Sequence, residues 1–429
     1  MGRGTSGLLR FDYTKINWQT LKKRFVSWEE RINNGDCKAT FNYLNHSYYD
    51  GYLNNILPEV RYEWLKKSVA NRNFLNHLTM RVFADSESQD HEWFLHIHDG
   101  KNIPFRIEYI DLYLFPHEIA VFSLKLIFTS EYDLNLGSVS DFTNKVRYLQ
   151  SKISSNKTGI TTIGNFVKET VIAPLNPDND WQIYNPQLKS YIQIDLNEQI
   201  DQETLDHLLF DIGNVSLIGS ANGEGLFAPS ESYYKEQIEN NKISVFRNWA
   251  ALSLYDTFTR ISINFPDRFK SWEYDYFNLY IYCLYLKFFM YLTNSEISNV
   301  TEVSKNTEKI RNRFVEFVND YYHTQISYKF LPDLMKDKLM YSLEINSEIK
   351  QMEKKVQRIN EHFQEKSQKS FNRALITITF LSVVSVITGF SDWIVQLGLP
   401  KKWMYPYISV GIGIIIIALI YYIFKGKKT

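Results

Sequence analysis

The sequence predicts an α+β cytosolic domain, followed by a long helical stalk and a C-terminal hairpin of two transmembrane helices. Three observations predict this order. Segments rich in aromatic and β-branched residues fill positions 91–130, as strands do. Glycine is absent from 226–388, which favours long helices. Two uncharged runs, at 374–391 and 404–424, are each long enough to cross a ~30 Å hydrocarbon core as a helix.

The first domain, residues 1–227, is predicted to mix strands and helices. HEWFLHIH, PFRIEYIDLYLF and EIAVFSLKLIF read as strands, separated by turn signals at Asp99-Gly100 and Pro116. Two later segments, 191–196 and 208–219, are also strand-like. The segment SVSDFTNKVRYLQSKI between them and the first strands is predicted to be helical.

The second region, residues 228–370, is predicted to be a helical bundle and stalk. Helices are expected at about 230–264, 270–293 and 296–325, and a fourth runs from about Pro332 into the first uncharged run. Apolar residues recur in the last helix at alternating steps of four and three, which is typical of a coiled-coil-like seam: Ile345, Ile349, Met352, Val356, Ile359 and Phe363. The chain has no glycine or proline between Pro332 and Gly389, so this helix is predicted to be continuous, on the order of 80 Å long.

The hairpin, residues 371–424, is predicted to lie in the inner membrane as two spans. Basic residues precede the first span, and the basic tail 425–429 follows the second. Because positive flanks stay in the cytoplasm, both termini are predicted to be cytoplasmic. The N-terminus has no apolar segment typical of a secretory signal peptide.

A polar stripe marks the first predicted span. On a helical wheel one sector contains Thr377, Ser382, Ser385, Thr388, Gly389 and Asp392. Polar groups in a span usually face a bundle interior or water, so these residues are predicted to line a pore. The alternative is that hydroxyls and small residues simply let helices pack closely. One hairpin cannot enclose a pore, so the first reading requires a ring of protomers.

This architecture and the segment RALITITFLSVVSVITG at 373–389 resemble the CorA family of divalent-cation channels. The resemblance implies a homopentamer whose first span lines the pore, with Mg²⁺ as the permeant ion. The chain departs from the family at its signature, because no Gly-Met-Asn triplet occurs and the segment after the span reads Gly389-Phe390-Ser391-Asp392. Asp392 would then form a ring of carboxylates at the pore mouth.

Divergent CorA-like proteins without the usual filter occur beside type III CRISPR systems. This resemblance implies an antiviral membrane effector opened by a nucleotide messenger built from S-adenosylmethionine and ATP, of the S-adenosylmethionine–AMP type. The 29 Tyr, 29 Phe and 9 Trp residues of the chain suit a body that receives such a ligand.

Other patterns give weaker signals. A formal net charge of zero gives no support for direct nucleic-acid binding. Cys37 and Cys283 form no disulfide framework or thiolate zinc site.

His91, His96 and His98 are better explained as surface or strand-packing residues than as metal ligands, and any metal-binding residues stay unassigned. The segment GSANGEG at 219–225 predicts a turn, because no Gly-Lys-Ser/Thr follows. Residues 272–292 predict a buried helix rather than a third span.

Arg247 and Arg260 are the weak candidates for ligand binding. Both are predicted to lie on a helix rich in Phe, Trp and Leu, where a guanidinium can clamp a phosphate. The alternative is an interhelical ion pair, with Asp256 as one partner. No arrangement of nucleophile, base or paired carboxylates is legible, so no catalytic residue and no enzyme is predicted.

The sequence therefore leads to one main hypothesis and two alternatives. The main hypothesis is a homo-oligomeric channel gated through its cytosolic body by a small nucleotide, with membrane lipid and further copies of the chain as partners. The first alternative is a constitutive Mg²⁺ transporter of the same fold. The second is a membrane-tethered receptor or scaffold with no pore.

Overall fold

We analysed a computed structural model of the chain. It describes residues 2–10, 26–27, 76–81, 92–97, 100–128, 135–175, 182–183, 187–223, 228–265, 275–298, 305–322 and 330–396, with the single residues 19, 225, 272, 411 and 413. The chain divides into two compact units, Met1–Lys354 and Lys355–Thr429. The domain limits predicted at 227/228, 370/371 and 424/425 stay predictions.

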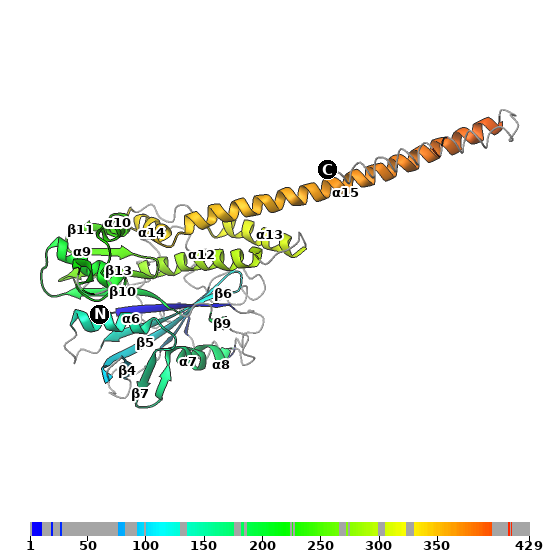
Figure 1. Cartoon of the computed structure of the whole chain (residues 1–429). Helices are drawn as coiled ribbons and strands as arrows, with labels where there is room; N and C mark the ends of the chain where they lie inside the picture. Colours follow the sequence, from blue (N-terminus) through cyan, green and yellow to red (C-terminus); the bar gives the residue numbers. More distant parts are fainter. Residues whose placement is uncertain are drawn as a thin grey trace. The chain divides into compact units, whose positions relative to one another are not determined.

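One large mixed sheet dominates the first unit (Figure 1). Within the described residues its main path runs β11–β12–β13–β10–β1–β6–β5–β4–β7–β8. β10 and β13 pair in parallel, whereas the other described neighbours pair antiparallel. The strands are β1 (Gly2–Arg10), β2 (Val26–Ser27), β3 (Asn76–Arg81), β4 (Trp93–His96), β5 (Asn102–Phe115), β6 (Ile119–Phe128), β7 (Lys152–Ser155), β8 (Gly159–Thr162), β9 (Gln182–Ile183), β10 (Lys189–Leu196), β11 (Lys242–Phe246), β12 (Trp249–Ser253) and β13 (Thr257–Ile263).

Side-chain caps define where several helices begin. Asn135, Asp201 and Ser230 each accept a backbone N–H three residues later, which satisfies one of the free donors of the first turn. The helices are α6 (Leu136–Val146), α7 (Ile163–Val167), a π-helical turn (Lys168–Ile172), α8 (Ala173–Leu175), α9 (Gln202–Gly213), a 3₁₀ turn (Ser220–Asn222), α10 (Glu231–Asn241), α12 (Asp275–Ser298), α13 (Lys305–Asp320), α14 (Phe330–Ser342) and α15 (Ile345–Gln396).

Two hydrophobic clusters form on the sheet. One gathers side chains of β4, β5 and β6 with α6 and α7, and the other gathers side chains of β10, β12 and β13 with α9. The strands β5 and β6 contain runs of buried apolar residues, so burial of this surface is the main stabilising term of the sheet. Gly7 of β1 faces Phe122 of β6, where a Cβ atom would overlap the phenyl ring.

α12 is buried against the sheet and the neighbouring helices. Its aromatic side chains pack on strand residues, for example Tyr285 on Phe115 with ring centroids 4.3 Å apart. Tyr280, Tyr282 and Leu284 are at most 1% exposed. The prediction that 272–292 contains a buried helix, and not a third span, is confirmed for the described residues.

The long helix α15 begins at a break that the sequence does not announce. Glu344 has a φ of +58°, a left-handed conformation that separates α14 from α15 without glycine or proline. The helix predicted to run unbroken from Pro332 is therefore wrong at its start, because it is divided into α14 and α15. From Ile345 to Gln396 the helix is continuous for 52 residues. Ile345, Ile349 and Met352 of the predicted seam are at most 4% exposed within one chain. These three positions therefore need no second copy to be buried, and self-association stays a prediction.

The secondary structure confirms some sequence predictions and overturns others. The segments predicted as strands at 93–128 and at 191–196 are β4, β5, β6 and β10. The first half of the segment 208–219, predicted as a strand, instead belongs to α9, which buries Leu208, Leu209 and Ile212 against the sheet. The helix predicted at 230–264 ends at Asn241, and three strands follow.

The predicted membrane hairpin is wrong for the part of the chain that the structure describes. Among those residues no helix combines the length and the apolar character that a bilayer crossing requires. This finding contradicts the predicted transmembrane fold class and the predicted two-span location in the inner membrane. It also contradicts the description of the chain as a membrane channel.

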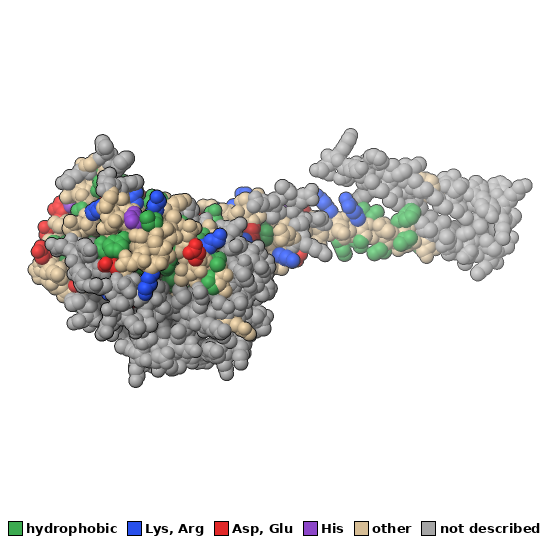
Figure 2. Space-filling model, turned by 90° about the horizontal axis from the view of Figure 1, so that it is seen from below, with side chains coloured by type: hydrophobic (Ala, Val, Ile, Leu, Met, Phe, Trp, Pro, Cys, Tyr) green, Lys and Arg blue, Asp and Glu red, His purple; other side chains and the backbone are tan. Residues whose placement is uncertain are grey.

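Exposed apolar side chains remain on α15. Figure 2 shows hydrophobic side chains after basic ones on the visible face of this helix, and exposed positions include Phe371, Leu375, Ile378, Leu381 and Val386. Three predicted segments lie outside the described residues: the loop after 396, the second span at 404–424 and the tail 425–429. Within the second span only residues 411 and 413 are described.

Candidate functional site

A cavity of about 950 Å³ lies where α9, α10, the β12–β13 turn, α14 and the start of α15 meet. All of its lining residues belong to the first unit. The lining comprises Arg147, Gly213, Asn214, Val215, Tyr233, Glu236, Gln237, Asn240, Asn241, Leu254, Tyr255, Asp256, Met340, Tyr341, Ser342, Glu344, Asn346, Ser347, Lys350 and Gln351.

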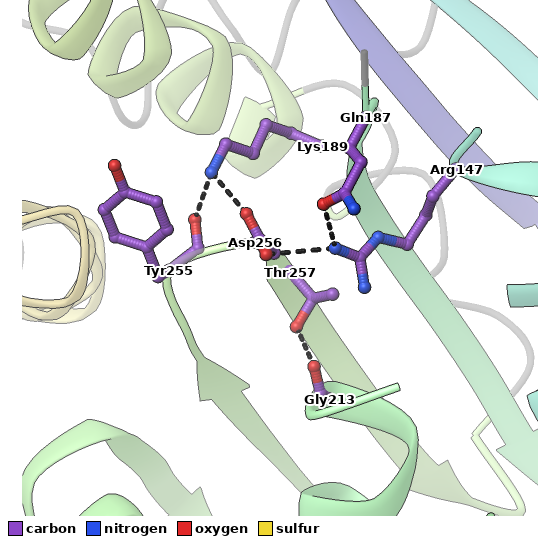
Figure 3. Close-up of polar contacts among 7 residues, drawn as sticks. All are labelled: Arg147, Gln187, Lys189, Gly213, Tyr255, Asp256 and Thr257. Carbon is purple, nitrogen blue, oxygen red and sulfur yellow. Dashed lines mark hydrogen bonds and ion pairs between the residues drawn. The ribbon is translucent and has the colours of Figure 1, made fainter. Parts of the chain in front are cut away.

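An ion cluster of Arg147, Lys189 and Asp256 adjoins this cavity (Figure 3), and Arg147 and Asp256 belong to the lining. Asp256, in the β12–β13 turn, accepts a 2.6 Å bond from Nζ of Lys189 on one carboxylate oxygen and a 3.0 Å bond from Nη2 of Arg147 on the other. Lys189 also donates to the carbonyl of Tyr255 at 2.9 Å. Arg147 follows the last turn of α6, where the negative end of the helix dipole favours a cation.

Burial sets the electrostatics of the cluster. The side chains of Arg147 and Lys189 are about 10% exposed, whereas that of Asp256 is 41% exposed. Burial lowers the pKa of Lys189, a shift that Asp256 opposes and that Lys287 and Arg147 reinforce. Burial alone would raise the pKa of Asp256, but Lys189 and Arg147 hold it below its ordinary value. The carboxylate is therefore charged at neutral pH, and two cations share it.

The ring of Tyr255 connects the cluster to α15. Nζ of Lys189 lies 3.9 Å from the centre of this ring and Nζ of Lys287, from α12, lies 4.9 Å from it. Lys287 in turn pairs with Glu348 of α15 at 2.6 Å. A continuous series of polar and cation–π contacts thus runs from the cavity wall to the first turns of α15.

Two residues with left-handed backbone conformations line the same cavity. Val215 after α9 and Glu344 before α15 both have a φ of +58°. A β-branched residue rarely adopts this conformation, and such strain is found preferentially at functional sites. Two buried hydroxyl contacts hold the adjoining segments: Thr257 donates to the carbonyl of Gly213 (Figure 3), and Ser253 and Ser342 lie 2.6 Å apart.

The rest of the lining is rich in carboxamides and tyrosines. Asn241 is 4% exposed, and its amide nitrogen donates to Gln237 at 2.8 Å. Its Oδ1 atom has no hydrogen-bond partner among the described residues, although buried acceptors usually have one. Tyr233, Tyr255 and Tyr341 are 43%, 46% and 57% exposed. The wall therefore offers aromatic faces, amide donors and acceptors, and a buried guanidinium to a ligand.

The two predicted ligand-binding arginines lie elsewhere. Arg247 is exposed in the turn between β11 and β12. Arg260 lies on β13, is fully buried, and stacks on Trp272 at 4.8 Å. Burial lowers the pKa of Arg260 to about 10. Neither lines the cavity, and the recorded ion pairs of Asp256 are with Arg147 and Lys189.

The residues predicted to line a pore lie on α15. The hydroxyls of Thr377 and Ser382 donate to the carbonyls of Arg373 and Ile378, a bond within the same helix that satisfies them without water. Ser385 is exposed. The side chains of Thr388, Gly389 and Asp392 are outside the described residues.

The described histidines and acidic residues form no metal-binding group. No cluster of three or more potential ligands occurs among the residues that were described. His96 hydrogen-bonds to Ser154 at 2.8 Å, which matches the expected strand-packing role, while His91 and His98 lie outside the described residues. The segment 219–223 is the predicted turn, in which Asp211 accepts from the backbone of Gly219 and Ala221.

Sequence reasoning missed the main residues of the site. Arg147 and Lys189 are isolated cations in unremarkable segments, and the fold brings them to Asp256, which is 109 and 67 positions away in the chain. Asp256 alone carried a signal, since it was expected to pair with an arginine. Comparison of the chain with family models, curated proteins and solved structures found no match.

Proposed function

We propose that the protein is a receptor for a small nucleotide-type ligand, which binds in the cavity and is sensed by α15. One observation carries the proposal: the same cavity is lined by a buried arginine of an ion cluster and by four residues of the first turns of α15. A ligand that touches both would bias the position of the helix, because it can favour one state only through different contacts in the two states.

The size and chemistry of the cavity support this class of ligand. Small-molecule pockets span about 300–1,000 Å³, and 950 Å³ is at the upper end, which suits a ligand larger than a mononucleotide. Exposed tyrosines can stack on a base, and carboxamides can hydrogen-bond to its edge. An arginine suits phosphate. The ligand implied by the CorA-like resemblance, an S-adenosylmethionine–AMP conjugate, offers all three groups and is the first compound to test.

The contact series through Tyr255 gives a route from ligand to helix. The ring of Tyr255 lines the cavity and lies between Lys189 and Lys287. A base or sugar that moves this ring also changes the surroundings of Lys287, which is paired with Glu348 of α15. The proposal assigns binding to the cavity and no reaction. It includes no pore, because no helix among the described residues is long and apolar enough to cross a membrane.

A cavity-blocking substitution tests the proposal. Ser347 is exposed and lines the cavity, so Ser347→Trp adds bulk there without disturbing a core. Gln364→Trp, at an exposed position further along α15, is the matched control. Isothermal titration with the S-adenosylmethionine–AMP conjugate, and mass spectrometry of small molecules retained from a nucleotide extract, should both show binding to the wild type and the control. At least tenfold weaker binding is expected for Ser347→Trp. Equal retention by all three proteins, or by none, would refute the proposal.

A further inference from the structure

The ion cluster at the cavity wall contains more positive than negative charge. Arg147 and Lys189 share the single carboxylate of Asp256, which leaves one positive charge without a counter-charge inside the cluster. Both cations are about nine-tenths buried, where water compensates charge poorly. Nearby, Lys287 is already paired with Glu348, so the surplus charge is located at Arg147, Lys189 and Asp256.

One donor of this cluster has no recorded acceptor. Nη2 of Arg147 binds Asp256 at 3.0 Å and Gln187 at 3.3 Å. The Nε atom of Arg147 is buried and has no hydrogen-bond partner among the described residues. A buried donor left unsatisfied is destabilising, and a guanidinium edge is shaped to bind two oxygens at once. Arg147 lines the cavity, so an oxygen-rich anion is the group that completes its bonding.

We infer that this corner of the cavity is a phosphate subsite in which Arg147 is the anchoring cation and Asp256 is an internal counter-ion that the ligand phosphate displaces. The inference rests on the proposed ligand-binding role of the cavity and specifies which part of the ligand lies where. Asp256 is suited to leave, since its side chain is 41% exposed and it lies in a turn. Lys189 keeps its bond to the carbonyl of Tyr255 and supplies the second positive charge.

Other charged residues of the lining limit the subsite to this corner. Glu236 of α10 and Glu344 before α15 would repel an anion, and Lys350 of α15 is the remaining cation of the lining. The cavity as a whole therefore has no excess of positive charge. Lys350 is exposed, so water already solvates its charge, and a phosphate gains most at the buried Arg147.

Inorganic pyrophosphate is a suitable probe, because it carries the anionic group without a base. Binding is measured by titration calorimetry and ³¹P line broadening on the full chain at constant ionic strength. Wild type should bind saturably, and Arg147→Gln should weaken binding at least tenfold. Asp256→Asn should tighten binding at least threefold, because it releases both cations from their internal partner. Lys235→Gln removes the same charge from an exposed residue outside the lining and should change nothing.

The opposite signs for Arg147→Gln and Asp256→Asn separate a phosphate subsite from general loss of folding. Weaker binding in both variants, equal binding in wild type and Arg147→Gln, or no saturable binding to wild type would each overturn the inference. The last result, together with Ser347-dependent retention of a nucleotide-type ligand, would leave the receptor proposal standing. If pyrophosphate binds at Arg147 but no nucleotide-type ligand is retained, the phosphate subsite stands and the receptor proposal fails.

Discussion

Nζ of Lys287 lies 2.6 Å from Oε1 of Glu348, which ties the buried helix α12 to the first turn of α15. The side chain of Lys287 is 7% exposed and that of Glu348 31%. Lys287 also faces the ring of Tyr255, a residue of the cavity lining, so Lys287 links that lining to α15. A charge buried to this degree depends on its partner, since removing the partner leaves an uncompensated charge.

Replacing Glu348 by Ala should destabilise the fold because Lys287 is left buried without its carboxylate. Breaking a fully buried pair costs about 3–5 kcal/mol, and the partial exposure of Glu348 reduces our expectation to about 2 kcal/mol. The double variant Lys287→Met, Glu348→Leu should recover most of the loss, since no buried charge remains. Urea denaturation monitored by circular dichroism measures both values. The exposed pair Lys235–Glu231 is the control, and Glu231→Ala should leave the midpoint unchanged.

Ile349 of α15 should contribute to the stability of a single chain. It is 4% exposed, so Ile349→Ala is expected to cost about 3 kcal/mol in the free energy of unfolding, as for buried aliphatic truncations. Leu375→Ala, at a residue that is 45% exposed, should cost less than about 0.5 kcal/mol. A large change in oligomer mass with little loss of stability for Ile349→Ala would show that this residue instead packs between copies.

His117 should make the protein sensitive to acid. Burial, reinforced by the charge of Arg313, lowers its pKa from 6.5 to about 3, and its ring packs on Phe289 and Tyr321. Between these pH values the unfolded chain binds a proton at His117 that the folded chain does not. Stability therefore falls as the pH falls below 6.5, by roughly 1.4 kcal/mol per pH unit for this group.

The comparison of His117→Asn with wild type isolates this effect, because Asn tolerates the φ of +63° at this position. The variant should lose less stability than wild type between pH 6.5 and pH 4.5, whatever its stability at pH 7. His362→Gln, at an exposed residue of α15, should follow the wild-type curve. Parallel curves for all three proteins would show that His117 titrates normally.

A larger residue at Gly7 should destabilise the fold while Phe122 is present. A Cβ atom at position 7 would overlap the ring of Phe122 and lie 2.8 Å from Cδ2 of Leu188, and β1 pairs with both β6 and β10. Gly7→Ala should therefore cost about 1–3 kcal/mol, as overpacking does. Adding Phe122→Leu should reduce that cost relative to the effect of Phe122→Leu alone. Thermal unfolding of the four proteins measures this coupling, and a strictly additive result would contradict the predicted contact.

Residue types in short segments predicted some strands correctly and misassigned others. The aromatic and β-branched segments at 102–115 and 119–128 are strands because their residue types fit a buried sheet. The segment 208–219 was misread because a short apolar run fits a buried strand and a helix face equally. The strands after Asn241 were missed because the scarcity of glycine and proline was taken as evidence for helices. Strands also contain few of these residues, so their scarcity does not distinguish a helix from a strand.

The site could not be read from the sequence because its residues meet only in the folded chain. The pairing of Asp256 with Arg147 depends on the parallel alignment of β10 with β13 and on the end of α6. The break at Glu344, which places the first turns of α15 at the cavity, carries no glycine or proline signal. The uncharged runs gave a strong membrane signal, but charge and length alone do not establish that a helix crosses a bilayer.

Hydrogen exchange of the backbone amides at 345–351, measured by mass spectrometry with and without the S-adenosylmethionine–AMP conjugate, tests the central claim most directly. Exchange here depends on local opening of the first turns of α15, which line the cavity. The account predicts that the conjugate slows exchange at these amides in wild type and in Gln364→Trp, and has no effect in Ser347→Trp. Absence of binding, or binding that leaves exchange at 345–351 unchanged, would contradict a receptor that is sensed by α15.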